Sequence, residues 1–292
     1  MEALITSARR DFHRSLFERG ILTKSDAGVL SNADRSSTLS KTIAASIARQ
    51  LVDEGGYTFN AIEKLSGQTL GKEFEKTVMR FVESTFPSLQ NLRPGYWTVI
   101  QLGNNARLKT SDFAQYEHLA YLNELTKANH ELKASLGNDY VVAPDVVVYR
   151  DLCRDDEINA SREIVDGDYA TRADLRWMDD GRKPILHASI SAKFTMRSDR
   201  AQNSRTEALN LIRNRKGRLP HIVVVTAEPM PNRIASLALG TGDIDCVYHF
   251  ALNELVVAVE ESGSEMAIET LDTLIVGKRL KDISDLPLDL TV

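Results

Sequence analysis

Apolar residues return at helical spacing through most of the first 90 residues. The segment 36–56 begins with Ser and Thr, carries apolar residues four positions apart and ends in Gly-Gly, which predicts a helix. An apolar stripe from Phe74 to Val82 predicts a second helix over residues 71–86. The same spacing places Glu75 at the edge of the buried face of that helix.

Shorter apolar runs rich in β-branched residues follow, and they favour strands. Residues 97–102 form one such run, and a helical stretch is expected around 112–136. Residues 140–149 form a second run, although Pro144 inside it cannot donate a ladder hydrogen bond and so favours an edge strand or a bulge. An irregular, acidic connection spans about 151–183.

The segment 185–193 alternates along its length, which predicts a strand with Ser191 and Lys193 on the same face. A helix is expected over residues 198–217, since apolar positions there have helical spacing and the segment ends in glycine. The continuous apolar run 221–229, ended by proline, then predicts a central strand.

This order of strand, strand, helix and strand predicts an α/β fold, an α/β/α sandwich around a central mixed sheet. Hydrophobic residues make up 42% of the chain and charged residues 26%, which is typical of a folded globular protein. No internal repeat or low-complexity linker interrupts the pattern. We therefore expect a single domain over residues 1–292.

The start of the chain is polar, and no apolar run reaches the roughly 20 residues of a membrane span. We therefore expect a cytoplasmic protein with no membrane contact. Cys153 and Cys246 are expected to stay reduced in that compartment. Neither cysteine has the neighbours of a metal-ligand motif.

Charge is distributed unevenly along the chain. The net charge is −5, yet residues 181–220 hold ten Lys or Arg against two acidic residues, so this zone carries +8 and the rest of the chain −13. A basic zone on an acidic body is typical of a protein that presents one surface to phosphates. A solvated helical face is the alternative explanation for such a run.

Two carboxylates and a lysine are expected to come from neighbouring elements. Asp145 lies in or just after a strand, Lys193 ends the alternating strand, and Glu207 lies on the helix after it. Mg²⁺ prefers oxygen ligands, and a lysine beside it stabilises charge on a phosphate or helps to deprotonate water. The set suits phosphodiester hydrolysis. Taken singly, however, these residues equally fit a turn residue, a strand-end charge and a surface carboxylate.

Short motifs around these residues resemble a known nuclease pattern. "APD" at 143–145, "SAK" at 191–193, "RSDR" at 197–200 and Glu207 are similar to the permuted variant of the PD-(D/E)xK nuclease motif. The usual motif has an acidic residue two positions before the lysine. Here that residue is Ser191, and in the permuted variant the next helix supplies the missing carboxylate.

The likeness runs along nearly the whole chain and is to the NgoMIV-type restriction endonucleases, in the branch that reads DNA sites with a CCGG core. It passes through "VLSNAD" at 29–34, "HASIS" at 187–191 and "LIRNRKGRLPHIVVVTAEP" at 211–229. This resemblance implies a restriction-endonuclease-like α/β/α sandwich. It also implies a Mg²⁺-dependent type II site-specific deoxyribonuclease.

The resemblance implies a role for each residue of the catalytic set. Asp145 would bind the metal, and Glu75 and Glu207 would complete or support the site. Ala192 would offer its backbone carbonyl to the metal. Lys193 would contact the scissile phosphate and the attacking water.

The resemblance also implies how the bases are read. Arg197, Asp199 and Arg200 would read the CCGG core in the major groove. Their chemistry suits that role, because arginine donates to guanine O6 and N7 while aspartate accepts from cytosine N4. The outer base pair would be contacted by Asp34 and Arg233, which suggests GCCGGC as the site.

Further expectations follow from the same resemblance. Gln68 matches a minor-groove position, where an amide meets the guanine amino group. Cleavage after the first G would leave four-base 5′ overhangs. A palindrome implies at least a two-fold dimer, and the resemblance implies a homotetramer, a dimer of dimers, on double-stranded DNA. A cognate DNA methyltransferase is expected in the same cell, and the terminal segment 277–290 is a candidate for subunit assembly.

Two other classes of function fit parts of the sequence. A sequence-specific DNA-binding protein on a degenerate nuclease fold would explain Ser191 and Ala192, but the intact Asp145, Lys193 and Glu207 argue against lost chemistry. A DNA repair nuclease would explain the basic zone. The aspartate within "RSDR" argues against it, because binding through the DNA backbone alone needs no acceptor among the arginines.

Overall fold

The computed structural model describes residues 2–59, 65–102, 109–121, 124, 144–196, 198–240 and 242–292, and for residues 198–201 it describes the backbone alone. Within these ranges a six-stranded sheet forms the centre of the molecule, with its strands in the order of the chain. The strands are β1 (Trp97–Gln101), β2 (Val146–Arg150), β3 (Ile185–Lys193), β4 (His221–Thr226), β5 (Cys246–His249) and β6 (Leu280–Asp282). β2 is antiparallel to both of its neighbours, β1 and β3, and the strands β3 to β6 are parallel, so the sheet is mixed.

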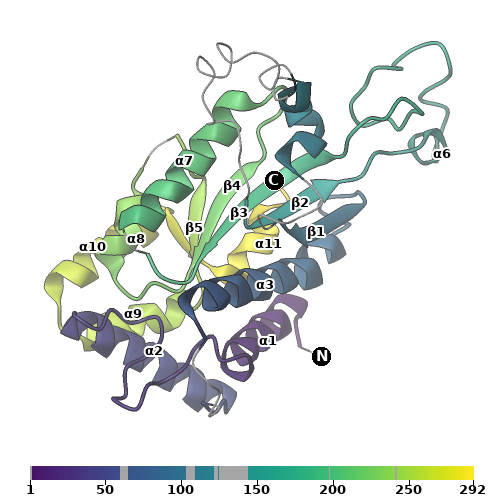
Figure 1. The fold of residues 1–292 in the computed structure, drawn as a ribbon. Coiled ribbons are helices and arrows are strands. Elements are labelled where there is room, and N and C mark those ends of the chain that lie inside the picture. The colour runs from purple at the N-terminus through teal and green to yellow at the C-terminus, as the bar shows by residue number, and fades with distance from the viewer. Residues whose placement is uncertain are drawn as a thin grey trace, which may run out of the picture.

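Helices flank this sheet (Figure 1). The longer ones are α1 (Leu4–Glu18), α2 (Thr38–Gly55), α3 (Gly67–Thr85), α7 (Ser198–Asn214), α8 (Pro231–Ala238), α9 (Leu252–Glu261) and α10 (Glu265–Val276). Figure 1 shows α3 crossing one side of the sheet at β1 to β3, while α7 and α8 lie on the other side. α1 packs on α3, and α2 packs on α9. The α/β fold predicted from the sequence, with a mixed sheet between helices, is confirmed.

Local capping explains where the helices depart from the predicted bounds. α3 begins at Gly67, four residues before the predicted start, because the Ser66 hydroxyl accepts the Thr69 N–H at 3.3 Å and caps the helix. α7 ends at Asn214, three residues before Gly217. The helical stretch predicted around 112–136 falls mostly outside the described residues.

The edge position predicted for the strand around Pro144 is wrong. β2 pairs with β1 on one side and with β3 on the other, so it is an interior strand. Pro144 precedes the first residue of β2, where its missing N–H costs no ladder bond. The predicted irregularity does occur, as a register shift against β3 between Val148 and Tyr149.

The strand β3 is the longest strand of this sheet and is buried along most of its length. Its residues from Leu186 to Ala192 are all buried between β2 and β4. Lys193 ends this strand and pairs in register with Thr226, the last residue of the parallel strand β4. The carboxyl ends of adjacent parallel strands are where open α/β sheets place their sites, so the fold presents Lys193 at such an edge.

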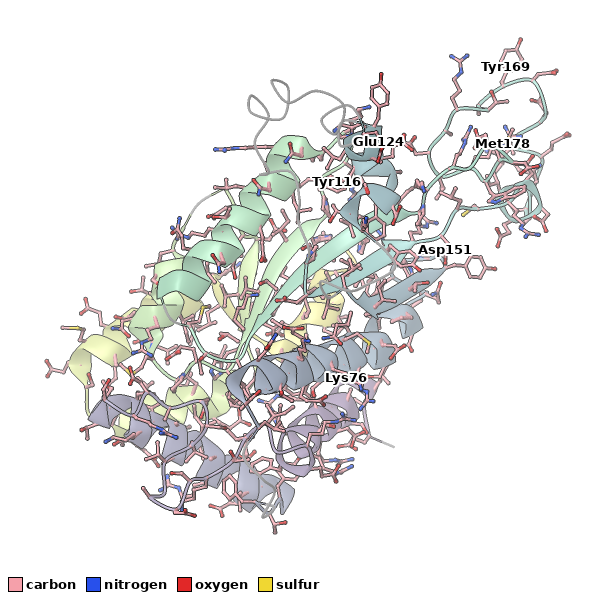
Figure 2. All side chains as sticks on the ribbon, in the orientation of Figure 1. Lys76, Tyr116, Glu124, Asp151, Tyr169 and Met178 are labelled. Atoms are coloured by element: carbon pink, nitrogen blue, oxygen red, sulfur yellow. The ribbon has the colours of Figure 1, made fainter. Side chains whose placement is uncertain are left out.

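The acidic connection between β2 and β3 projects from the body as an arm that contains the short helix α6 (Asp155–Ile158) (Figure 1). Tyr169 lies far out on this arm and is 80% exposed (Figure 2). Arg176 is buried within the arm and donates to both carboxylate oxygens of Asp155, at 2.7 and 2.8 Å. This bidentate pair fixes the shape of the arm where it carries few apolar contacts.

The terminal segment 277–290 belongs to the core of the subunit. It adds the edge strand β6 and the short helix α11 (Leu286–Asp289). Its apolar residues Ile283, Leu286 and Leu290 are buried within this chain while Leu288 is 45% exposed, and the suggested role of the segment in assembly stays a prediction. No helix in the described part of the chain is long and apolar enough to span a bilayer. Cys153 and Cys246 are both free thiols.

Three buried histidines are expected to make the fold sensitive to mild acid. Burial lowers the pKa of His13, His187 and His249 to about 4, while an unfolded histidine has a pKa of about 6.5. The unfolded chain therefore binds more protons between these values, so stability is complete above pH of about 6.5 and falls as the pH drops toward 4. Each histidine should contribute a slope of about 1.4 kcal/mol per pH unit.

Urea unfolding between pH 7 and 5 tests this expectation. The variant His187→Gln keeps a donor for the Leu290 carbonyl, which His187 Nε2 meets at 2.7 Å, but removes one titrating group. The slope of its unfolding free energy against pH should be shallower, because the variant takes up about one proton fewer on unfolding. An unchanged slope would contradict the burial argument, whatever the absolute stability of the variant.

Candidate active site

Asp145 is the point on which the end of β3 converges. It lies directly before β2, and its backbone carbonyl accepts the Leu102 N–H at 2.9 Å, which extends the β1–β2 ladder. Its Oδ2 accepts hydrogen bonds from Lys193 Nζ and from the Ala192 N–H, each at 2.8 Å, and from Ser191 Oγ at 3.4 Å. The structure thus brings three consecutive residues of the predicted motif onto one carboxylate oxygen.

Lys193 is largely enclosed, with a side chain that is 16% exposed. Burial by itself opposes the positive charge, but the carboxylates of Asp145, Glu207 and Glu75 outweigh it and raise the pKa of the ammonium. Lys193 therefore stays protonated at neutral pH.

Glu75 reaches the pocket beside Asp145 from α3. Gln101 at the end of β1 donates its amide to Glu75 Oε2 at 2.9 Å and holds the carboxylate toward the sheet. Burial and the nearby charge of Asp145 raise the pKa of Glu75. Its place in the apolar stripe of α3, beside Phe74, explains why a glutamate is half-buried here.

Glu207 enters from α7. Burial raises the pKa of its carboxyl to about 7, although Lys193 opposes the shift, and Asp145 and Glu75 add to it. Ser204, one helical turn earlier, lies 3.2 Å from Ser191 between the two hydroxyl oxygens. The serine that stands where the usual motif has an acid is therefore joined to the helix that carries Glu207.

These groups share one pocket of about 320 Å³, lined among others by Glu75, Asp145, Ala192, Lys193 and Glu207. Its donors are carboxylate oxygens beside a strand end, which suit Mg²⁺ in kind. Among the residues that the structure describes, however, no three acidic, histidine or cysteine side chains stand close enough to hold an ion between them. One oxygen of Asp145 is instead taken by the Lys193 ammonium.

Of the residues predicted to read the CCGG core, Arg197 lies outside the described part of the chain. Asp199 and Arg200 lie in the first turn of α7, and their side chains are outside the described part as well. Gln68 is exposed in the first turn of α3 and lines the same pocket as Asp145.

The two residues predicted to contact the outer base pair lie on different elements and form an ion pair with each other. Asp34 lies in the loop before α2, and Arg233 lies on α8. Ser36 also donates its N–H at 2.9 Å and its hydroxyl at 2.7 Å to Asp34 Oδ1. Ser36 and then Arg233 hold the pKa of Asp34 well below its usual range.

Sequence reasoning missed three polar residues that hold these groups in place: Gln101, Thr226 and Glu228. Thr226 donates its hydroxyl to the carbonyl of Lys193 at 2.8 Å, and Glu228 is fully buried just after β4. The available signal was weak, since each is a single polar residue at the end of an apolar strand. Such residues are also common at ordinary strand ends.

Comparisons with known proteins identify the family of the chain. The family model of the NgoMIV restriction enzyme matches residues 12–292. The type II restriction enzyme NgoMIV of Neisseria gonorrhoeae is 52% identical over 292 residues, which is all of both chains.

A solved complex of the restriction endonuclease PspGI with substrate DNA is 11% identical, and the match covers 99% of this chain and 92% of that one, with a TM-score of 0.28. A score this low carries no argument, so the family assignment depends on the full-length match. The chain belongs to the NgoMIV restriction enzyme family and is a type II restriction enzyme, a nuclease that cleaves DNA.

Proposed function

We propose that the chain is a Mg²⁺-dependent type II restriction endonuclease that cleaves double-stranded DNA at a palindrome with a CCGG core. The site that we propose is GCCGGC, cut after the first G to leave four-base 5′ overhangs. The observation that carries the catalytic part is the convergence of the end of β3 on Asp145, in a pocket shared with Glu75 and Glu207.

Asp145, Glu75, Glu207 and the backbone carbonyl of Ala192 are the groups that would hold Mg²⁺. Their oxygens are the ligands that this cation prefers. Burial, and to a smaller extent the charges of neighbouring carboxylates, raise the pKa of both glutamates, and a bound divalent cation would favour their charged forms. When bound, the metal would lower the pKa of a coordinated water and neutralise charge on the phosphate.

Lys193 supplies a positive charge at the reacting phosphate in this proposal. A protonated ammonium cannot accept a proton, so its raised pKa favours donation to a phosphate oxygen over a role as general base. The contacts of Asp145 with Lys193, Ala192 and Ser191 orient the strand end toward the pocket. Ser191 acts in the site through these contacts and leaves the second acid position to Glu207.

Base reading is assigned to two groups of residues. Arg197, Asp199 and Arg200 would read the core, which is supported by the start of α7 lying directly after the segment that follows Lys193. Asp34 and Arg233 would read the outer pair, and their contact supports a shared task, since cytosine N4 needs an acceptor and guanine needs a donor fork. Gln68 would contact the minor groove, a role supported by its exposed place at the pocket.

We also propose that residues 1–292 act as one domain and that four copies assemble as a dimer of dimers, with a cognate DNA methyltransferase in the same cell. A palindrome requires two symmetry-related subunits.

Cleavage of plasmid DNA with Mg²⁺, followed by sequencing of the ends, tests the proposed function. Cuts confined to GCCGGC, lost with EDTA and restored by added Mg²⁺, are expected. Tight specific binding without cutting would support a sequence-specific DNA-binding protein instead. Scattered or structure-dependent cuts would support a repair nuclease.

The variant Asp199→Ala is expected to lose discrimination at the core. Without a carboxylate to accept from cytosine N4, the ratio of kcat/KM for GCCGGC over a core-substituted duplex should fall about tenfold to a hundredfold, since one good base contact contributes about 1–3 kcal/mol. Asp179→Ala, which removes an exposed charge from the arm, is the control. If this ratio of kcat/KM is the same in the two variants, Asp199 does not read the core.

A further inference from the structure

Glu228 is a fully buried carboxylate placed between the two proposed base-reading segments. It follows β4 and is 0% exposed. Its Oε2 accepts the N–H of Met196 at 2.8 Å, one residue before Arg197. Its Oε1 accepts the N–H of Met230 at 3.2 Å and lies 3.8 Å from Nη1 of Arg233. Each oxygen therefore serves a different reading segment.

These contacts are made at the entrances of two helices. Met230 is the N-cap residue of α8, which carries Arg233 in its first turn, and Met196 lies two residues before the start of α7. The first N–H groups of a helix have no partner inside the helix. Glu228 accepts from the backbone at both approaches, so its position sets the distance between the two helix starts.

The backbone around Glu228 is itself tied to the catalytic strand and to the Asp34 loop. Thr226 accepts the Glu228 N–H at 3.1 Å and donates its hydroxyl to the Lys193 carbonyl at 2.8 Å. The amide of Asn32, two residues before Asp34, donates to the Ala227 carbonyl at 2.9 Å. Residues 226–230 thus contact the end of β3, the segment before α7, the start of α8 and the Asp34 loop.

A fold does not need a carboxylate here for stability alone. Burying an ionised group is costly, and burial raises the pKa of Glu228 to about 7 although two N–H groups and Arg233 favour its charge. Glu254, which is also deeply buried, has a full bidentate partner in Arg9, at 3.0 and 2.7 Å. The contacts of Glu228 instead go mainly to the backbone of two reading segments.

We propose that Glu228 is a specificity-positioning residue, which holds the segment before the core-reading residues and the start of α8 in one register, while Thr226 ties that register to Lys193. This inference rests on the proposed function, because it takes the assignment of the reading residues from it. Residues 226–230 thereby link three functions, which are outer-base reading by Arg233, core reading at the start of α7 and cleavage at Lys193.

Steady-state cleavage by Glu228→Gln tests the inference. An amide oxygen can accept only one of the two N–H bonds, and its NH₂ group then faces the other donor. The ratio of kcat/KM for GCCGGC over ACCGGT and over a core-substituted duplex should fall about tenfold, an effect of the size expected for one lost buried contact. Glu254→Gln is the matched control, since it neutralises an equally buried glutamate at the Arg9 pair.

The outcomes separate the inference from the proposed function. If the wild-type enzyme does not prefer GCCGGC over ACCGGT, the proposed site is wrong. If the wild-type enzyme does prefer it, and Glu228→Gln loses stability like Glu254→Gln but keeps the wild-type ratio, Glu228 is only structural and the inference is overturned.

A second pair of variants covers the case in which Glu228→Gln fails to fold. Thr226→Val keeps the shape of the side chain but removes the bond to the Lys193 carbonyl, and Thr226→Ser retains a hydroxyl. We expect Thr226→Val to lower kcat about tenfold with little change in KM, and Thr226→Ser to recover most of the loss. Equal kcat in Thr226→Val and the wild type would overturn the link to Lys193.

Discussion

Replacing Lys193 with alanine is expected to abolish cleavage while DNA binding persists. The ammonium contacts Asp145 at 2.8 Å and is surrounded by three carboxylates, so its removal leaves their negative charge uncompensated beside the phosphate. Loss of a positioned charge that stabilises a transition state typically costs a factor of about 10²–10³. Because the electrostatic repulsion of the substrate adds to this loss, we expect a decrease of about a thousandfold or more.

Single-turnover cleavage of a GCCGGC duplex measures the rate, and gel shift in Ca²⁺ measures binding. Lys76→Ala is the control, since Lys76 lies on α3 next to Glu75 but does not line the pocket (Figure 2). Binding by Lys193→Ala should stay within a few fold of the wild type. Cleavage at the native rate would show that the site assignment is wrong.

The second large effect is expected when the acidic residue of α7 is removed and then replaced by one on β3. Glu207→Ser is expected to lower the cleavage rate about a hundredfold or more, because it removes one of the carboxylates that face the pocket. Ser191 contacts both Asp145 and Ser204, so a glutamate at position 191 would lie between the same two elements. The double variant Ser191→Glu with Glu207→Ser should therefore recover at least about tenfold of the lost rate.

A second double variant tests whether position matters. Asn203→Glu with Glu207→Ser also returns one acid to the pocket wall, but from the α7 side only. This double variant should recover little activity, because the new carboxylate comes from α7 and not from the position on β3 that contacts Asp145. Equal recovery in both double variants would show that the pocket needs only net charge, and it would contradict the role of Ser191 as the vacated acid position.

Local pattern determined a large part of this protein. The alternation over 185–193 places Ser191 and Lys193 on one face because successive side chains of a strand point to opposite sides, and both side chains do reach Asp145. The apolar run after Gly217 gave a buried parallel strand, and the stripe from Phe74 placed Glu75 at a half-buried edge. These features depend only on residues a few positions apart.

The place of each strand in the sheet could not be predicted from such local patterns. Pro144 argued for an edge strand, yet β2 lies inside the sheet, because Pro144 stands before the strand and both neighbours come from distant segments. The segment 277–290 was a candidate for assembly, and its sequence did not show that it also adds the edge strand β6 and buries Ile283, Leu286 and Leu290 in the same chain.

Only the tertiary structure decided which polar groups meet. Asp34 and Arg233 are 199 residues apart and form an ion pair, and Glu228 joins the approaches to α7 and α8. Such contacts depend on strand order and register, which long-range packing sets, since a buried carboxylate is retained only where the surrounding groups supply its partners. The sequence by itself determined the elements and the chemical groups, and the packing of those elements decided their common site.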